Sequence, residues 1–261
     1  MLTYRNGRVI AMGTLAGQVA IVTGAGQGVG RGIARAVAAE GAKVVVLGRT
    51  KSKCGAVASE IRDLGGEAIE VQCDVEHRDQ IEASVELVLS TWGRLDLLVN
   101  NAQSMVFRSI RKLTDDDMDM MWRSGPMASF RFMQACFEPL RESKGCVVNM
   151  GSGSGIMPQA AMAGYGMAKE ALRTLSRGAA VEWGRFGIRV NSICPLAESP
   201  GADAFNDSTA AADAVTSQVP LGRWGDAEAD IGRGVVYLAS DAGRFVTGTT
   251  LMIDGGFNYL R

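Results

Sequence analysis

QVAIVTGAGQGVG, residues 18–30, is the stretch that decides the fold of this 261-residue sequence. Residues 18–23 are a short apolar, β-branched run, which is typical of a buried parallel strand. A glycine-rich turn follows directly, and a helix is predicted from about Gly28 to Glu40. Glycines in such a turn let the backbone approach a pyrophosphate, whose charge then lies at the helix N-terminus. A glycine cluster alone can be just a tight turn. Between a strand and a helix, we interpret it as a dinucleotide-binding turn made by Gly24, Gln27, Gly28, Val29 and Gly30.

The rest of the chain alternates apolar runs with amphipathic segments. Six further strands are predicted at residues 43–47, 68–73, 95–99, 146–150, 188–193 and 250–253. Strands that alternate with helices predict an α/β fold, here one doubly wound, seven-stranded parallel sheet with helices on both faces. We expect this single domain to span residues 14–261 and to follow a poorly ordered N-terminal tail, residues 1–13. The polar, alanine-rich residues 196–218 are expected to form a loop that covers a substrate site.

The end of the second strand bears on the choice of cofactor. A carboxylate there would bind the ribose 2′-hydroxyl of NAD, whereas a basic residue would pair with the 2′-phosphate of NADP. The strand ends in Gly48-Arg49-Thr50-Lys51, which has no carboxylate. Arg49 can bind a phosphate with two hydrogen bonds, and Thr50 can add a hydroxyl. The alternative is that Arg49 and Lys51 are solvated loop charges. We predict NADP(H) in preference to NAD(H).

Polar residues also follow the third and fourth strands. Asp74-Val75 ends the third and is expected to border the adenine ring. Asp74 can face the adenine amino group, cap the next helix or do both. Asn100-Asn101-Ala102 ends the fourth strand. Asn101 and Ala102 are expected near the ribose, whereas Asn100 is expected to bind neighbouring loops.

A tyrosine and a lysine in Tyr165-Gly166-Met167-Ala168-Lys169 lie about one turn apart on one face of a predicted helix. A phenol titrates near ~10, and a nearby ammonium favours the phenolate. Such a pair can pass a proton to or from an alcohol or carbonyl oxygen. The spacing alone is also typical of an ordinary exposed helix face. Ser152 and Ser154 lie in a glycine-rich turn after the fifth strand, at the sheet edge where active sites collect.

In this order, the motifs resemble those of the short-chain dehydrogenase/reductase family over nearly the whole chain from about Leu15. They are TGAGQGVG at 23–30, Asp74, NNA at 100–102, Ser152, YGMAK at 165–169, RVNSICP at 189–195 and DGG at 254–256. The resemblance implies a Rossmann-like fold and a homo-oligomer, most often a tetramer. It also implies that Tyr165 donates or removes the proton, that Ser152 holds the carbonyl oxygen and that Lys169 binds the nicotinamide ribose and lowers the Tyr165 pKa. The backbone near Pro195 would meet the carboxamide.

Three positions depart from the family pattern. NNAQ replaces NNAG, so that Gln103 brings a side chain where the family has none. Ser124-Gly125 stands where a helix normally supplies an asparagine to the proton relay, and Pro126 should interrupt that helix. Ser124 could replace the asparagine by ordering a water, because a hydroxyl both donates and accepts hydrogen bonds. Leu196 follows Pro195 in place of the usual glycine.

Composition excludes several other classes. The 27 basic and 28 acidic side chains are nearly balanced, which argues against nucleic acid or an anionic membrane as the partner. With His77 as the single histidine, neither a histidine-based metal site nor a Ser-His-Asp triad is possible. The five scattered cysteines predict reduced, mostly buried thiols and a cytoplasmic protein without bound metal.

These observations predict an NADP(H)-dependent oxidoreductase that interconverts a small carbonyl compound and its alcohol. The alternative is a dinucleotide-binding sensor or assembly protein with little catalytic activity. The substrate cannot be read from the sequence. By position, the candidates for lining its pocket are Gln103, Ser154, Met157, Leu196 and Phe205.

Overall fold

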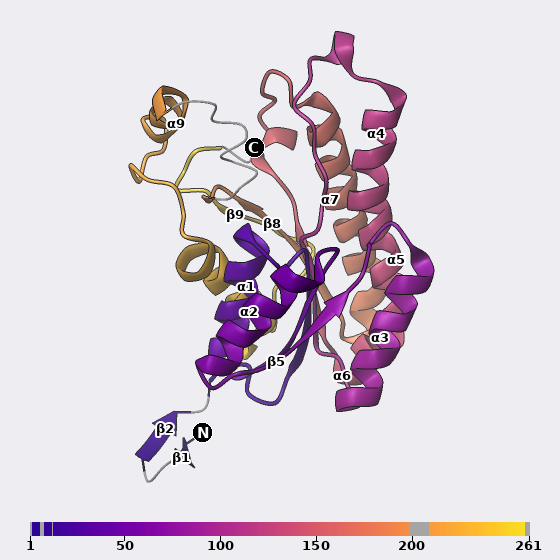
Figure 1. The fold of residues 1–261 in the computed structure, drawn as a ribbon, viewed down its shortest axis with the longest axis vertical. Coiled ribbons are helices and arrows are strands. Elements are labelled where there is room, and N and C mark those ends of the chain that lie inside the picture. The colour runs from indigo at the N-terminus through magenta and orange to yellow at the C-terminus, as the bar shows by residue number, and fades with distance from the viewer. Residues whose placement is uncertain (1, 6–7, 12, 199–208, 259–261) are drawn as a thin grey trace.

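The computed structural model describes residues 2–5, 8–11, 13–198 and 209–258. At its centre is a parallel sheet of seven strands in the order β5-β4-β3-β6-β7-β8-β9 (Figure 1). The strands are β3 (Val19–Thr23), β4 (Lys43–Gly48), β5 (Glu67–Gln72), β6 (Leu97–Asn100), β7 (Cys146–Met150), β8 (Arg189–Pro195) and β9 (Thr250–Ile253). The order reverses between β3 and β6, which makes this the switch point where open α/β sheets bind ligands. The predicted doubly wound sheet is confirmed.

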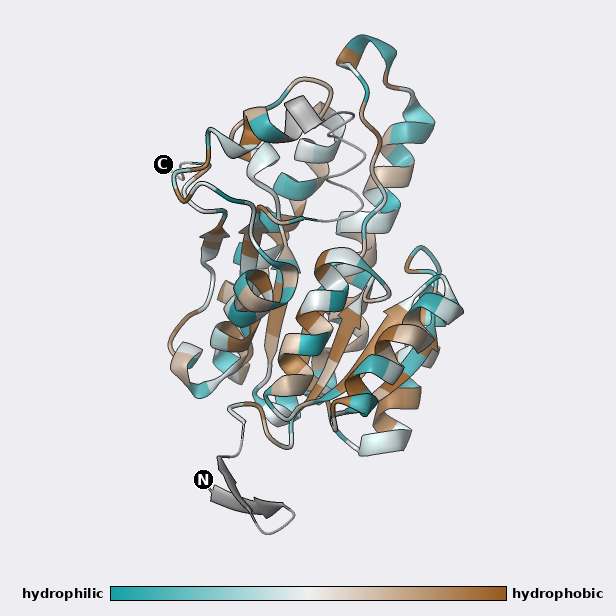
Figure 2. Cartoon of the chain, turned by 60° about the vertical axis from the view of Figure 1, so that its left-hand side comes forward, coloured by the Kyte–Doolittle hydropathy of each residue, from teal (hydrophilic) through white to brown (hydrophobic). Residues whose placement is uncertain are grey.

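Helices cover both faces of the sheet because its central strands, β3, β4, β6, β7 and β8, are buried on both sides. In β3, Ala20 and Val22 pack into one core cluster, and Val19 and Ile21 pack into the other. The first cluster lies under α1 (Gly28–Ala39), α2 (Lys51–Asp63) and α10 (Arg233–Ala239). The second lies under α3 (Arg78–Trp92), α5 (Ala128–Ala135) and α7 (Ala163–Trp183). Figure 2 shows the apolar strands enclosed between helices whose outer faces are polar.

The predicted interruption near Pro126 is a π-helical turn, η2 (Arg123–Met127), between α4 (Asp115–Trp122) and α5. Proline has no N–H for the helical ladder, so the backbone locally widens its turn there. The remaining helical segments are η1 (Ile110–Lys112), α6 (Phe137–Ser143), η3 (Gly153–Gly155), η4 (Gly184–Phe186), α9 (Thr209–Thr216), η5 (Ala227–Gly232) and η6 (Asp241–Gly243).

The start of the chain differs from the expected irregular tail. Strands β1 (Leu2–Arg5) and β2 (Arg8–Ala11) pair with each other in a separate antiparallel sheet, seen apart from the main sheet in Figure 1. In the expected substrate loop, residues 199–208 lie outside the described residues, and α9 follows them. Within the described ranges, no helix combines the length and apolar character needed to cross a membrane.

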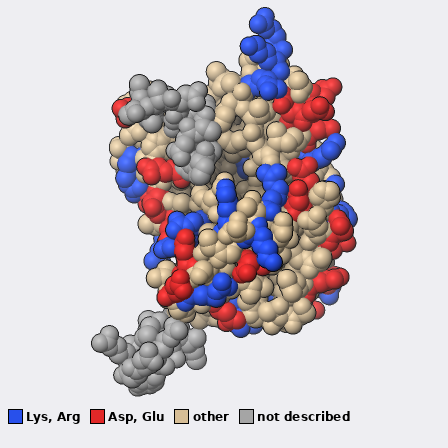
Figure 3. Space-filling model, viewed as in Figure 1, with Lys and Arg blue, Asp and Glu red and all other residues tan. Residues whose placement is uncertain are grey.

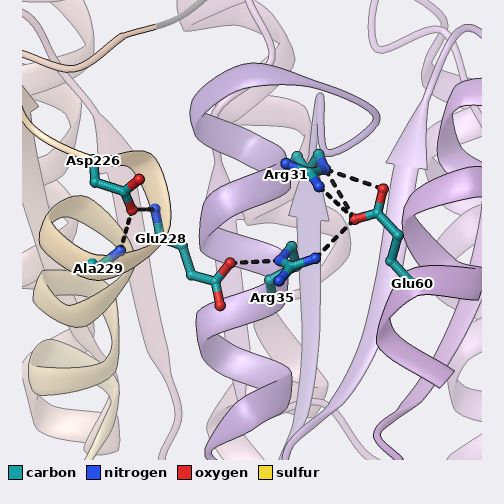
Figure 4. Close-up of polar contacts among 6 residues, drawn as sticks. All are labelled: Arg31, Arg35, Glu60, Asp226, Glu228 and Ala229. Carbon is teal, nitrogen blue, oxygen red and sulfur yellow. Dashed lines mark hydrogen bonds and ion pairs between the residues drawn. The ribbon is translucent and has the colours of Figure 1, made fainter. Parts of the chain in front are cut away.

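Helix α1 is held between two neighbours by an arginine that pairs on both sides (Figure 4). Arg35 Nη1 lies 3.0 Å from Glu60 on α2, and its Nε lies 2.5 Å from Glu228 on η5. Helices α1 and η5 approach closely because Gly32 has no side chain. A β-carbon at this position would lie 2.6 Å from the carbonyl oxygen of Ala227. These contacts fix the helix whose N-terminus begins at the glycine-rich turn.

Buried amides and hydroxyls tie α7 to the sheet. Asn100 Nδ2 donates to Asn149 Oδ1 at 2.8 Å, and Asn149 Nδ2 donates to Ser176 Oγ on α7 at 2.8 Å. Ser192 Oγ on β8 donates to the same serine at 2.9 Å. All four residues are buried, and a satisfied polar network of this kind specifies one arrangement of its elements. The expected structural role of Asn100 is confirmed.

Candidate active site

The glycine-rich turn has the geometry of a phosphate cradle. Gly24 and Gly28 have φ angles of +64° and +56°, which side chains of L-residues rarely tolerate. A β-carbon on Gly30 would come 2.5 Å from Asn101 Nδ2. Helix α1 then begins without a side-chain cap from Gln27 and without an acidic residue in its first turn. Its first N–H groups and positive dipole end are therefore open to an anion.

Asn101 anchors this turn to the neighbouring strand end. Its Nδ2 donates to the carbonyl oxygen of Thr23 at 2.9 Å, and its backbone N–H donates to Thr23 Oγ1 at 2.9 Å. The backbone N–H of Ala102 donates to the same hydroxyl at 3.0 Å. The two strand ends thus form one continuous wall beside the turn.

A cavity of about 390 Å³ runs along this wall at the carboxyl edge of the strands. Eleven of the predicted cofactor-binding residues line it, namely Gly24, Gln27, Gly28, Val29, Gly30, Arg49, Thr50, Asp74, Val75, Asn101 and Ala102. The glycine cradle, the uncapped helix and the length of the wall fit a dinucleotide. We refer to this space as the cofactor cavity.

The sequence reasoning missed Lys53 in the cofactor cavity. Lys53 follows Thr50 by three residues, nearly one helical turn, and lines the same cavity. Its Nζ donates a hydrogen bond to Gln27 Oε1 at 2.6 Å. Arg49, Thr50 and Lys53 are all exposed where they line the cavity. A second cation on the helix face next to Arg49 could have been found from the sequence. Lys51 does not line the cavity.

Asp74 does not cap α3, so that alternative was wrong. The N-cap of α3 is His77, and Asp74 Oδ1 instead accepts the backbone N–H of Glu76 at 3.1 Å. The intervening residues turn the chain before the helix begins, so the carboxylate remains at the cavity wall. Its placement beside adenine stays a prediction.

A second cavity, of about 240 Å³, contains Ser152, Tyr165, Lys169 and Pro195 in its walls. We refer to it as the catalytic pocket. Its apolar lining includes Met105, Phe107, Met150, Met162, Leu196, Ala197, Val215, Trp224 and Phe257. Among the expected pocket residues, Gln103, Ser154 and Leu196 line it, whereas Met157 does not, and Phe205 lies outside the described residues. Val29, Asn101 and Gln103 line both cavities, which therefore adjoin.

Burial dominates the ionisation of the tyrosine and the lysine. It raises the pKa of Tyr165 to about 12, while a hydrogen bond with Ser152 acts in the opposite direction. Burial lowers the pKa of Lys169 to about 8. The net shift of the Tyr165 pKa is upward here, and its lowering by Lys169 stays a prediction. Lys169 Nζ donates to the carbonyl oxygen of Met150 at 2.6 Å and lies 5.4 Å from the centre of the Tyr165 ring.

Ser152 forms hydrogen bonds with Ser154 as well as with Tyr165. Ser152 Oγ lies 2.8 Å from Ser154 Oγ and accepts the Ser154 backbone N–H at 3.2 Å. Ser154 is buried in the turn that follows β7. These bonds hold the Ser152 hydroxyl just after the end of β7, where it also forms a hydrogen bond with Tyr165.

Ser124 does not join this group. Its Oγ donates to the carbonyl oxygen of Met120 at 2.7 Å and accepts the backbone N–H of Ser104 at 3.0 Å. It lines the cofactor cavity but not the catalytic pocket. Its single hydroxyl proton is already used within α4 and η2, so the expected replacement of the relay asparagine by Ser124 finds no support in these contacts.

Metal-ligating side chains do not cluster in the part of the chain that the structure describes. No group of three histidine, cysteine, aspartate or glutamate side chains there could hold a metal ion. All five cysteines are free and buried, as predicted. Figure 3 shows basic and acidic side chains intermixed over the face in view.

Comparisons with known proteins agree with this geometry. A family model described as enoyl-(acyl carrier protein) reductase matches residues 24–258. The chain is 39% identical over 254 residues to a 12α-hydroxysteroid dehydrogenase from a Clostridium species, covering 94% of this chain and 98% of the relative. It is 31% identical over 248 residues to a cyclopentanol dehydrogenase from a Comamonas species, covering 94% and 99%.

A crystal structure described as a candidate short-chain alcohol dehydrogenase from Sinorhizobium meliloti superposes with a TM-score of 0.88 at 30% identity, covering 93% of this chain and 97% of the other. Both the fold and the sequence matches extend over nearly the whole chain, including the two cavities. The chain therefore belongs to the short-chain dehydrogenase/reductase family and is an NAD(P)-dependent oxidoreductase that interconverts alcohols and carbonyl compounds.

Proposed function

We propose that the protein reduces a small, apolar cyclic ketone with NADPH and oxidises the corresponding secondary alcohol in reverse. One observation carries the proposal. Ser152, Tyr165 and Lys169 converge on a mainly apolar pocket that adjoins the cofactor cavity. A proton donor, a hydrogen-bond donor and a buried cation beside a dinucleotide site are the groups that carbonyl reduction needs.

In the proposed mechanism, Tyr165 gives its hydroxyl proton to the carbonyl oxygen of the ketone. With a pKa of about 12, the Tyr165 phenol carries this proton at neutral pH, which supports the reductive direction. Ser152 donates a hydrogen bond to the same oxygen and stabilises the negative charge that develops there. The nicotinamide, when bound, supplies the hydride to the carbonyl carbon. Lys169 would hold the ribose, and the Pro195 backbone would hold the carboxamide.

The preference for NADP(H) over NAD(H) rests on the end of β4. Arg49 and Lys53 put two cations at the cofactor cavity, and Thr50 adds a hydroxyl. No carboxylate follows β4. The residues there therefore offer no charge that would repel the 2′-phosphate of NADP and no carboxylate that would accept the 2′-hydroxyl of NAD. A guanidinium can bind phosphate with two parallel hydrogen bonds.

The substrate class rests on the pocket and on the relatives. The apolar side chains give the substrate few groups to bond besides the carbonyl oxygen, which favours a hydrocarbon ring. The relatives named for their substrates act on ring alcohols, a hydroxysteroid and cyclopentanol. The described walls enclose about 240 Å³, and we propose the single ring rather than the steroid as the substrate. Assembly into a homotetramer or dimer, and residence in the cytoplasm, stay predictions.

The test measures the rate at which the purified protein consumes NADPH in the presence of each of four ketones. They are cyclopentanone, cyclohexanone, a straight-chain ketone with as many carbons as cyclopentanone, and a ketosteroid. We expect the highest kcat/KM with the two single-ring ketones. Turnover of none of them would contradict the proposal, and a preference for the ketosteroid would contradict the substrate size.

A further inference from the structure

The hydrogen bonds around the Ser152 hydroxyl decide where its proton points. A hydroxyl has one proton to donate and two lone pairs that accept. One lone pair of Ser152 Oγ accepts the backbone N–H of Ser154 at 3.2 Å. Ser154 Oγ lies 2.8 Å away, and Tyr165 is the third partner. Either serine can donate in the bond between the two hydroxyls, and the two directions have different consequences for Tyr165.

The available acceptors favour Ser154 as the donor. Ser154 is only 7% exposed, and Ser152 is the one hydrogen-bond partner of its hydroxyl among the described residues. If Ser152 donated to Ser154, the Ser154 proton would have no acceptor in the part of the chain that the structure describes, which is costly for a buried group. If Ser154 donates, its own proton is bonded and the Ser152 proton remains for the Tyr165 oxygen. A donation from Ser152 also agrees with the effect of this bond on the Tyr165 pKa, which it lowers.

The turn that bears Ser154 packs against the helix that bears Tyr165. Helix α7 contacts η3, and a β-carbon on Gly166 of α7 would lie 2.9 Å from the carbonyl oxygen of Ser154. One turn further along α7, Glu170 reaches the end of η3, since a β-carbon on Gly155 would lie 2.5 Å from Glu170 Oε1. Close backbone packing, as well as hydrogen bonding, therefore sets the position of Ser154 relative to Tyr165.

We propose that Ser154 is a positioning residue for the reaction: by donating to Ser152 Oγ, it keeps Ser152 a hydrogen-bond donor and leaves the Tyr165 proton for the ketone. With both lone pairs of Ser152 Oγ occupied, Ser152 does not accept the proton that Tyr165 must give away. When the ketone enters, the Ser152 proton turns to the carbonyl oxygen, and the Tyr165 proton moves to the same oxygen. No covalent bond of Ser154 changes. The inference rests on the roles proposed above for Ser152 and Tyr165.

Ser154→Ala removes the donated proton and keeps the backbone N–H bond. We expect kcat for ketone reduction to fall about 3- to 10-fold, the effect of one hydrogen bond between neutral groups. The KM for the ketone and the Kd for NADPH should stay within about 2-fold of their original values, because Ser154 holds neither ligand. In alcohol oxidation, the apparent pKa in the pH profile of kcat/KM should rise, since a less polarised Ser152 stabilises the Tyr165 phenolate less. An unchanged kcat, or a loss confined to KM, would overturn the inference.

Because Ser154 acts through Ser152, the two substitutions should not add. Ser154→Ala should change kcat by less than about 2-fold when it is introduced into Ser152→Ala, a coupling that independent sites do not show. Additive losses would show that Ser154 contacts the ketone itself, which would overturn the inference.

Ser192→Ala is the matched control. It also breaks a bond between two buried serines, Ser192 and Ser176, and neither of these lines the cofactor cavity or the catalytic pocket. It should lower the melting temperature as Ser154→Ala does and leave kcat unchanged. An equal fall of kcat in Ser192→Ala would show that the loss of any buried serine pair is sufficient, and the inference would then be wrong.

A neutron structure of the deuterated, cofactor-free protein tests the direction of the bonds without any assay. We expect the Ser154 deuterium between the two serine oxygens and the Ser152 deuterium directed at Tyr165 Oη. A Ser152 deuterium directed at Ser154 Oγ would overturn the inference, whichever ketone is the substrate. The expected deuterium positions in a protein that reduces none of the four ketones would support the bond direction and contradict only the proposed function, so the two failures are distinguishable.

Discussion

The side-chain amide of Gln103 fills the space in which a β-carbon on Gly125 would lie, so a side chain at position 125 would require the amide to move. They lie on different elements, one after β6 and the other in the π-helical turn η2. Gln103 and Gly125 thus connect two of the positions at which the sequence departs from the family pattern. The nearby amide also favours glycine in the π-helical turn, where a helix would ordinarily avoid one.

The cations at the end of β4 should control the choice of cofactor. Arg49→Ala is expected to raise the Kd for NADPH about 10- to 100-fold, because a hydrogen bond to a charged group contributes about 1.5–3 kcal/mol. Lys53→Ala should act in the same direction with a smaller effect. The Kd for NADH should change less than about 3-fold in both. Titration of cofactor fluorescence measures these constants.

Lys51→Ala is the matched control, because Lys51 is an exposed lysine of the same helix that does not line the cofactor cavity. It should leave both constants unchanged. Equal losses of NADPH and NADH binding in Arg49→Ala would refute the NADP(H) preference.

Burial of the charged Lys169 side chain should lower the free energy of unfolding at neutral pH. Burial lowers its pKa from the usual 10.5 to about 8, so between these values the unfolded chain binds more protons than the folded one. The stability contributed by this residue therefore rises as the pH rises from about 8 to 10.5, and below 8 the full penalty applies. Lys169→Met keeps the aliphatic stem and should raise the free energy of unfolding by about 1–3 kcal/mol at pH 7.

Urea unfolding of both proteins between pH 7 and 10 measures this difference, which should shrink as the pH rises. A lower stability of Lys169→Met at pH 7 would show that the hydrogen bond to Met150 outweighs the burial of the charge. A difference that stays constant with pH would show that the Lys169 pKa is not lowered.

The close approach of α1 and η5 should tolerate no methyl group at Gly32. Gly32→Ala would push a β-carbon to 2.6 Å from the Ala227 carbonyl oxygen, which the two backbones can relieve only by moving apart. We expect a loss of about 1–3 kcal/mol in the free energy of unfolding, as for other overpacked sites. Weaker NADPH binding should accompany it, because α1 begins at the phosphate cradle.

Gly55→Ala in α2 is the control, since a β-carbon there meets no atom within 4 Å. It should be neutral or stabilise by up to about 1 kcal/mol, because alanine favours the helix over glycine. Thermal unfolding in parallel compares the two. Similar values for both variants would show that the α1–η5 packing is less tight than the structure indicates.

The sequence predicted the sheet well because its central strands are short apolar runs buried on both faces. All seven appear within two residues or so of their expected ends, and glycine and proline marked the turns and the π-helical interruption correctly. The residues that line the cofactor cavity were also predictable, since in a parallel sheet they follow strand ends that share one edge. Lys53 was missed because it lies inside a helix, although its spacing from Thr50 was a usable signal.

Other features depend on tertiary contacts that a linear pattern does not contain. The proximity of Gln103 to Gly125 arises where a loop packs on η2, 22 positions further along the chain. The rise of the Tyr165 pKa depends on how deeply the phenol is buried, whereas the sequence pattern indicated only the charge of Lys169. The pairing of β1 with β2 was missed although Asn6-Gly7, a dipeptide typical of two-residue hairpin turns, stands between the two strands in the sequence.

The most direct measurement is NADPH-dependent reduction of cyclopentanone by the original protein and by Tyr165→Phe, with NADPH binding measured on both. The phenylalanine ring keeps the packing and removes only the hydroxyl, so NADPH should bind with the same Kd within about 2-fold, while kcat falls at least about 100-fold, the scale of a lost general acid. Undiminished turnover in Tyr165→Phe, or tight NADPH binding with no turnover of any ketone by the original protein, would contradict the proposal that Tyr165 donates the proton in an NADPH-dependent carbonyl reduction.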